Sequence, residues 1–283
     1  MTTPPTTVPP PTKPPAISPP ATPPPAAPPT TPPGPAQAVA AAVERAMRPV
    51  SAKAEGKVAV AVADLATGLS ATAGATGHAF VTASVAKADI LATLLLQAQH
   101  AGRELTAQER AWARTMIENS DNDAADALYS RIGLAAGLDS ANRTFGLTAT
   151  TGGADRHWGL TETTAGDQLK LLLVLFGDHS PLSAASQAYL RTLMGQVEAD
   201  QTWGVPAAAD PGSAYLVKNG WLPRSATGLW VINSIGLVTH DGHRLLIAAL
   251  SDGSTTQARG IALAESAATA AATALTEALG TGA

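Results

Sequence analysis

The stretch GLWVINSIGLVTHDGHRLLIAALSD, residues 228–252, is the part of the sequence that decides the fold. Two runs rich in branched and aromatic residues meet at Asp241 and Gly242, a dipeptide that favours the tight turn of a β-hairpin. The preceding run AYLVKNGW, residues 214–221, has the same β-rich composition. These segments predict three consecutive antiparallel strands near the carboxyl end of the chain.

The rest of the chain supplies two more strands and several helices. GKVAVAVADLATGLSATAG, residues 56–74, predicts a second hairpin, and residues 36–48 predict an amphipathic helix in which apolar residues recur every four positions. Residues 84–197 are mostly helical in pattern, and the Ala-rich residues 257–279 predict a closing helix. This order brings the two ends together in one mainly antiparallel sheet, with a helical block inserted between its halves.

The amino-terminal segment differs from the rest in composition. Of the 22 prolines, 17 lie before Ala36, so residues 1–35 are expected to form a disordered, polyproline-like arm. Residues 36–283 are expected to form a single globular domain with a sizeable core. The segment has neither the basic region nor the apolar run of a secretory signal, and no apolar stretch of about 18 residues predicts a membrane span.

Charge and residue usage exclude several functional classes. The net charge is -4 and no basic cluster is interleaved with aromatic residues, so we expect no nucleic-acid partner. Without cysteine the chain has no disulfides, thiolate metal ligands or cysteine nucleophile. The 6 histidines are scattered without a zinc-binding spacing, and we expect no metal or cofactor. The tryptophans are expected to pack in the core or at its rim: Trp112, Trp158, Trp203, Trp221 and Trp230.

Three short motifs carry candidate chemistry. Ser84 and Lys87 are three residues apart, so on a helix they lie on one side, about a turn from each other. A desolvated lysine held there can act as a base towards the hydroxyl, although a helix cap with a solvated lysine has the same spacing. The second motif is Ser120, Asp121 and Asn122, between two predicted helices, and the third is Lys218, Asn219 and Gly220, on a predicted strand.

Together the three motifs resemble the S-x-x-K, S-D-N and K-T-G set of class A β-lactamases and penicillin-binding proteins. Their order agrees, Phe80 stands four residues before the serine, and TETTAGDQLKLL, residues 161–172, is similar to the start of a later helix of the family. The resemblance covers about 240 residues from Ala36 onward. It implies an α/β fold in which a five-stranded antiparallel sheet has the two terminal helices on one face and an all-helical block on the other.

The resemblance also implies roles for the motif residues. Ser84 would attack the carbonyl, Lys87 would accept or relay its proton, and Ser120 would pass a proton to the leaving nitrogen. The remaining positions would bind substrate: Asn122, Lys218, Asn219, Gly220 and Trp221. The backbone amides of Ser84 and Trp221 would be the two donors to the oxyanion, and Gly220 would leave room for the substrate. For Asp121 we expect only a helix cap.

Two features depart from the family pattern. Asn219 replaces a threonine or serine, so its part in binding a carboxylate is in question, and Arg224 is an alternative cationic helper. Class A enzymes have a loop glutamate, in an E-x-x-L-N pattern, that activates water. This sequence contains no such pattern. The only glutamate between Glu118 and Glu198 is Glu162, which we retain as a catalytic candidate although it suits a helix N-terminus equally well. We therefore expect acylation with weak deacylation.

Several alternatives stay open. The substrate is expected to be a β-lactam, or else a peptidoglycan peptide as for a penicillin-binding or peptidase-like enzyme. A different class of function is a non-catalytic wall-binding module, for which a nucleophile with a proton relay has no use. The family resemblance implies a location outside the cytoplasm, and we expect a monomer.

Overall fold

The computed structural model describes residues 1–5, 12 and 34–280, so most of the predicted Pro-rich arm lies outside the described residues. Its central element is a five-stranded antiparallel sheet with the strand order β2-β1-β7-β6-β5. The strands are β1 (Lys57–Asp64), β2 (Ser70–Gly74), β5 (Leu216–Pro223), β6 (Trp230–His240) and β7 (His243–Ser254). Both predicted hairpins are present, and the predicted sheet is confirmed.

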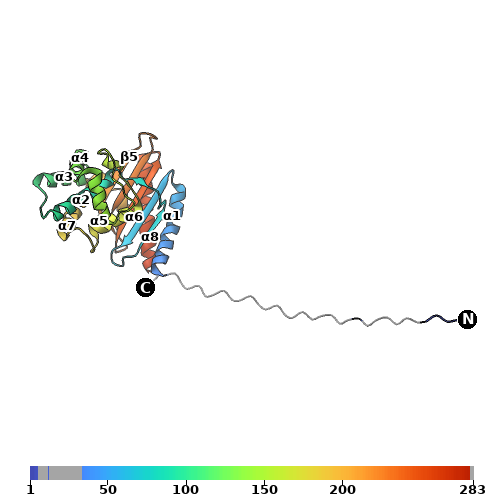
Figure 1. Cartoon of the computed structure of the whole chain (residues 1–283). Coiled ribbons are helices and arrows are strands. Elements are labelled where there is room, and N and C mark those ends of the chain that lie inside the picture. Colours follow the sequence, from blue (N-terminus) through green and yellow to red (C-terminus); the bar gives the residue numbers. More distant parts are fainter. Residues whose placement is uncertain (6–11, 13–33, 281–283) are drawn as a thin grey trace. The chain divides into compact units, whose positions relative to one another are not determined.

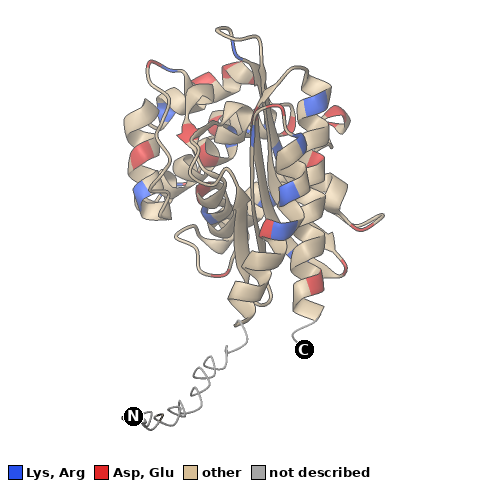
Figure 2. Ribbon diagram, turned by 90° about the vertical axis from the view of Figure 1, so that its right-hand side faces the viewer, with Lys and Arg blue, Asp and Glu red and all other residues tan. Residues whose placement is uncertain are grey.

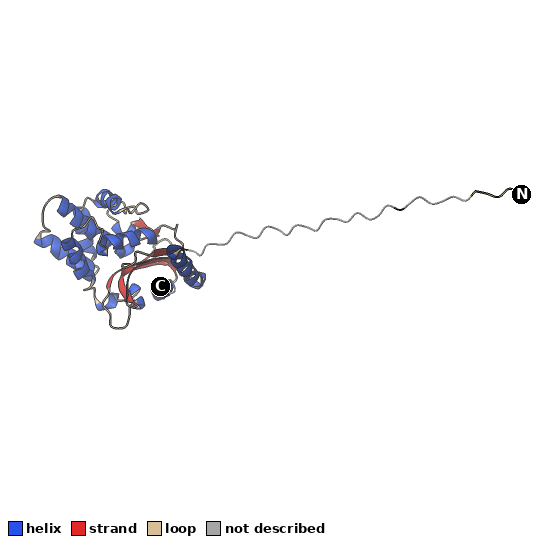
Figure 3. Cartoon of the chain, turned by 90° about the horizontal axis from the view of Figure 1, so that it is seen from below, coloured by secondary structure: helices blue, strands red, loops and turns tan. Residues whose placement is uncertain are grey.

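The sheet lies between two helical layers (Figures 1 and 3). Helices α1 (Pro35–Lys53) and α8 (Gln257–Gly280) pack against each other, and α8 covers β1, β6 and β7. Helix α6 (Ala165–Phe176) contacts the same three strands from the opposite face. The predicted placement of the terminal helices on one face and the helical block on the other is thus confirmed.

Strand β1 shows how the sequence produces this layered arrangement. Successive side chains of a strand point to opposite faces, and in KVAVAVAD valines and alanines alternate. The valines, such as Val60, pack with α1 and α8, whereas the alanines, such as Ala61, pack with the helical block. All of these side chains are buried, and the small alanines let α6 approach the sheet closely.

The inserted block contains the remaining helices: α2 (Ala86–His100), α3 (Ala107–Glu118), α4 (Asn122–Arg131), α5 (Leu134–Phe145), α6 and α7 (Ala184–Met194). It is not entirely helical, because β3 (Phe80–Val81) and β4 (Glu162–Thr163) form a two-stranded ladder beside it. Two-residue strands are too short to give a periodic pattern, so the sequence did not predict them. Short 3₁₀ turns connect the elements: η1 (Ala83–Val85), η2 (Trp158–Leu160), η3 (Ala199–Gln201) and η4 (Val205–Ala208).

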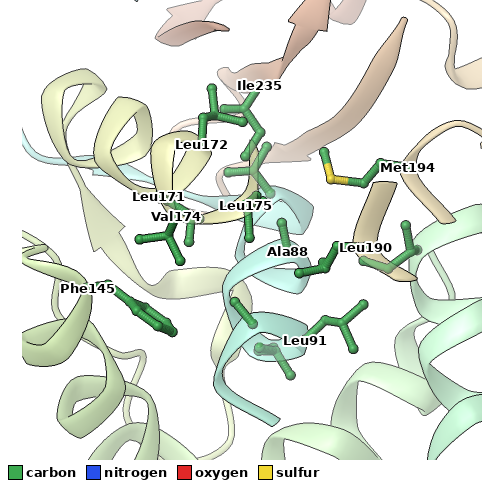
Figure 4. Close-up of a cluster of buried hydrophobic side chains, with 14 of the residues drawn as sticks. Ala88, Leu91, Phe145, Leu171, Leu172, Val174, Leu175, Leu190, Met194 and Ile235 are labelled. Carbon is green, nitrogen blue, oxygen red and sulfur yellow. The ribbon is translucent and has the colours of Figure 1, made fainter. Parts of the chain in front are cut away.

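Helix α2 runs through the centre of the block and is buried on almost every side. Figure 4 shows Ala88 and Leu91 of α2 among apolar side chains of α6 and α7, including Leu175 and Leu190. Each fully buried leucine contributes roughly 2 kcal/mol to stability. The packing therefore fixes the start of α2, where Lys87 lies, relative to the sheet.

The charged residues show no face of a single sign in the view of Figure 2, where both signs are mixed over the helices. Within the described ranges, no helix is both long enough and apolar enough to cross a membrane.

Candidate active site

Ser84 lies in η1, the single 3₁₀ turn between β3 and α2. The turn is fastened to the loop before β4, because the Thr82 N–H donates to the Thr161 carbonyl at 2.8 Å. Ala83, immediately before the serine, has a φ of 48°, a left-handed conformation that costs a residue with a Cβ about 1 kcal/mol or more. The half-buried Ser84 is therefore held on a strained turn by the surrounding structure.

Lys87 is fully buried in the first turn of α2. Its Nζ donates to the Ser120 carbonyl oxygen at 2.6 Å, to Ser120 Oγ at 3.2 Å and to Asn122 Oδ1 at 2.8 Å. These bonds use every N–H of the protonated amine. Burial lowers the pKa of Lys87 to about 7, although the Asp121 and Asp126 carboxylates oppose the shift. Much of the amine is therefore neutral near pH 7 and able to accept a proton.

Lys218, on β5, is the second buried amine of the site. Its Nζ donates to Ser120 Oγ at 3.0 Å and to the Asn219 carbonyl at 3.1 Å. Burial and the nearby charge of Lys87 hold the pKa of Lys218 well below its usual range. The Ser120 hydroxyl thus lies between two buried amines. The backbone of Ser120 is in the left-handed conformation, with a φ of 54°.

Gly220 brings β5 directly against the turn that carries Ser84. A Cβ at this position would stand 2.7 Å from the Ser84 amide nitrogen and 2.7 Å from the Thr82 carbonyl oxygen, so no side chain fits. The backbone amides of Ser84 and Trp221, predicted to hold the oxyanion, accordingly belong to two segments in contact. A role of this pair as oxyanion donors stays a prediction.

Asn233 supports the turn that carries Ser84 from β6, where it stands opposite Gly220 in the strand register. Its Nδ2 donates to the carbonyls of Val81 and Thr82 at 2.8 and 3.0 Å, and its Oδ1 accepts from the Ser251 N–H at 3.1 Å. Asn233 belongs to none of the three motifs. The available signal was an asparagine within a largely apolar predicted strand, where a buried polar group needs specific partners.

The side chain of Asn219, which the sequence predicts to contact substrate, is buried and bonded to a neighbouring loop. It is 1% exposed, and its Nδ2 donates to the carbonyls of Gln201 and Trp203 at 2.8 and 3.0 Å. The amide is longer than the hydroxyl of a threonine, and it holds the segment that connects η3 to η4. The Asn219 side chain thus has a structural contact in this fold, and its contact with substrate stays a prediction.

Glu162 is likewise not brought to the motif residues. It lies in β4, where its backbone pairs with Val81 and Thr151, and its side chain is exposed. The carboxylates that act on the charge of Lys87 are those of Asp121 and Asp126. The structure therefore gives no support to Glu162 as the group that activates water.

Asp121 is the N-cap of α4, as predicted, and its Oδ1 accepts from the Ala124 N–H at 2.7 Å. This cap fixes the helix start that places Asn122 against Lys87. Asp121→Ala is expected to lower the free energy of unfolding by about 1 kcal/mol, measured by urea denaturation. Asp121→Asn keeps a capping oxygen and should lose much less, so equal losses in the two variants would contradict the cap.

Trp158 and Asp126 are site residues that the sequence analysis did not identify. The Trp158 ring centroid lies 4.6 Å from Lys87 Nζ, and its indole N–H donates to Asp126 Oδ1 at 2.6 Å. From the sequence Trp158 is expected only to pack. The usable signal for Asp126 is its spacing, since it follows Asn122 by four residues on the same predicted helix.

A cleft of about 440 Å³ opens beside these residues. It is lined by Asn122, Asp126, Asp155, Arg156, His157, Trp158, Gly159, Leu160 and Leu222. Larger hollows of about 530, 540 and 900 Å³ lie beside α1 and α8, beside α3 and α4, and beside the β1–β2 turn, respectively, but none of the three contains a motif residue. No group of three or more His, Asp or Glu side chains is placed to hold a metal ion in the part of the chain that the structure describes.

Comparison with protein families gives a match over residues 95–275 to a family described as "Beta-lactamase enzyme family". The matched region includes Ser120, Asn122 and Lys218, whereas Ser84 and Lys87 lie before it. No curated protein matches the sequence.

Solved structures match over most of the chain. A class A β-lactamase from Bacteroides cellulosilyticus has 15% identity and a TM-score of 0.73, covering 85% of this chain and 99% of its own. A putative class A β-lactamase from Rhodopseudomonas palustris has 20% identity and a TM-score of 0.70, covering 82% and 99%. A variant of PBP-A, solved as an acyl-enzyme complex with penicillin G, has 20% identity and a TM-score of 0.70, covering 84% and 97%. At these identities the likeness concerns the fold.

Proposed function

The chain belongs to the beta-lactamase enzyme family, and on that premise we propose that this serine hydrolase opens the amide bond of a β-lactam through an ester on Ser84. The observation that carries the proposal is the Ser120 hydroxyl, 3.2 Å from Lys87 Nζ and 3.0 Å from Lys218 Nζ. Two buried amines with lowered pKa values on one hydroxyl form a path for protons beside the nucleophile.

In the proposed acylation, neutral Lys87 takes the proton of Ser84 Oγ while the oxygen attacks the carbonyl carbon. The amides of Ser84 and Trp221 stabilise the oxyanion, and loss of one such donor costs about 10²- to 10³-fold in rate. The carbon–nitrogen bond then breaks, and the leaving nitrogen receives a proton through the Ser120 hydroxyl. Lys218 helps to bind the substrate carboxylate.

We further propose that hydrolysis of the Ser84 ester is slow. The oxygen atoms within hydrogen-bond distance of Lys87 Nζ belong to Ser120 and Asn122, and Glu162 is exposed on β4. No carboxylate accepts a hydrogen bond from Lys87 or Ser84 within the described ranges, so water lacks the usual acidic partner.

A peptidase-like enzyme acting on peptidoglycan peptides is the second candidate, and slow release of a β-lactam favours it. The structurally similar PBP-A variant is an acyl-enzyme with penicillin G, which is the state we propose for this chain. For either substrate we propose a domain that begins near residue 36 and works outside the cytoplasm, as is usual for the family.

Intact-protein mass spectrometry during incubation with penicillin G tests the proposal. We expect one covalent adduct that persists over many minutes in the wild type and none in Ser84→Ala. Rapid turnover without an accumulated adduct would indicate an efficient β-lactamase. Absence of both adduct and turnover would contradict the proposal and favour the non-catalytic wall-binding module.

A further inference from the structure

The position of Trp158 over Lys87 has a consequence for the lifetime of the acyl-enzyme. Lys87 Nζ has three oxygen acceptors from Ser120 and Asn122, and the Trp158 ring covers another side at 4.6 Å. An aromatic face attracts an ammonium group and excludes water from it. With this ring in place, the Lys87 side chain is 0% exposed.

The ring is anchored by Asp126. Its N–H donates to Asp126 Oδ1 at 2.6 Å, and Asp126 lies one helical turn after Asn122 on α4. The indole is therefore held at one edge by a carboxylate on the same helix that supplies an acceptor to Lys87.

The turn that carries Trp158 is itself docked on the turn that carries Ser84. A Cβ on Gly159 would lie 4.0 Å from the Ala83 Cα, and the Thr161 carbonyl accepts from the Thr82 N–H at 2.8 Å. Just before Trp158, Asp155 and Arg156 both have left-handed backbones, with φ values of 48° and 66°. Two consecutive strained residues of this kind persist only where the surroundings over-determine them.

We propose that the Trp158 indole, anchored by Asp126, is a lid over Lys87 that keeps water from the Ser84 ester and thereby sets the rate of deacylation. This inference rests on the proposed function. In the release step, water bonds to the ester carbonyl carbon and its proton passes to neutral Lys87. The bond from that carbon to Ser84 Oγ then breaks, Oγ regains the proton from Lys87, and the product leaves as a carboxylic acid.

The test follows formation and loss of the penicillin G adduct by intact-protein mass spectrometry in four variants. Trp158→Ala removes the lid and is expected to speed release of the adduct at least tenfold. Asp126→Ala frees the indole and should change release in the same direction. Asp126→Asn keeps an acceptor for the indole N–H and should release slowly, although it loses the same charge as Asp126→Ala. Trp112→Ala, a half-buried tryptophan on α3, controls for the loss of an aromatic side chain.

The outcomes separate the lid from the proposed function. Normal acylation with unchanged release in both Trp158→Ala and Asp126→Ala would overturn the lid alone. Slower acylation without faster release would assign Trp158 a purely structural role and also overturn the lid. A wild-type protein that never forms the adduct would overturn the proposed function, and the lid with it.

Discussion

Lys87→Met is expected to lower the rate of Ser84 acylation by about 10²- to 10⁴-fold, the usual contribution of a general base. Methionine keeps the unbranched, apolar part of the buried side chain but is one atom shorter and has no amine to accept the serine proton. Stopped-flow or quenched measurement of adduct formation with penicillin G gives the rate directly.

The same amine sets the pH dependence of acylation in the wild type. Because burial lowers the pKa of Lys87 to about 7, the neutral, proton-accepting form increases as the pH rises through 7. We expect the acylation rate to level off above pH 8 and to be about 100-fold lower at pH 5, two units below that pKa. Lys87→Met should lose this dependence.

Lys170→Met is a matched control, since Lys170 pairs with Asp167 on α6 and contacts no motif residue. It is expected to acylate like the wild type. An acylation rate in Lys87→Met within tenfold of wild type would contradict the role of Lys87 as base.

Asp89→Asn is expected to stabilise the protein strongly at alkaline pH. Asp89 lies two residues after Lys87 on α2, is 2% exposed, and has no hydrogen-bond partner for either carboxyl oxygen among the residues described. Burial raises its pKa from 3.8 to about 7, although the neighbouring Asn142 amide opposes the shift. The carboxyl group is therefore neutral in the folded protein where it is ionised in the unfolded chain.

The direction of the effect follows from proton uptake. Because the folded pKa is the higher one, the contribution of Asp89 to stability is complete below pH 4 and is lost as the pH rises through 7. The loss amounts to roughly 4 kcal/mol, about 1.4 kcal/mol for each unit of pKa difference. An uncharged asparagine avoids it.

Urea denaturation of both proteins between pH 4 and pH 9 measures this difference. The stability of Asp89→Asn relative to wild type should increase steadily up to about pH 7 and then stay constant. Asp178→Asn, at an exposed position after α6, is the control and should show no such trend. A difference that is independent of pH would contradict a neutral Asp89.

The fold was predictable from the sequence where side-chain periodicity is strong. The alternating valines and alanines of β1, the Asp241–Gly242 turn and the apolar run of α2 each correspond to an observed element. The ladder of β3 and β4 was not predictable, since it joins two-residue segments about 80 positions apart and depends on tertiary contacts.

The site was predictable only in part, for a related reason. Spacing within one motif places Ser84 near Lys87, and the order of the motifs indicated that Ser120 and Lys218 belong to the same site. Motif order does not indicate where a side chain points. Asn219 was therefore expected to face the substrate, whereas in the structure its side chain bonds to a loop.

Other contacts between distant segments were not predicted from the sequence. Trp158 reaches Lys87 because the segment between α5 and α6 folds back over α2, and nothing in its own neighbourhood indicates this. Asn233 similarly acts on carbonyls about 150 positions earlier in the chain.

The hydrogen bonds from Asn233 and the close contact of Gly220 also determine when, during biosynthesis, the turn that carries Ser84 becomes ordered. Ser84, Lys87, Ser120 and Asn122 are all synthesised within the first 122 residues, but the turn that presents Ser84 is held by β5 and β6, from positions 216–240. Such long-range pairings form late, because closing a long loop costs entropy before any contact compensates for it. A nascent chain that already contains Ser84 therefore has no organised Ser84 turn until β5 and β6 have emerged and paired.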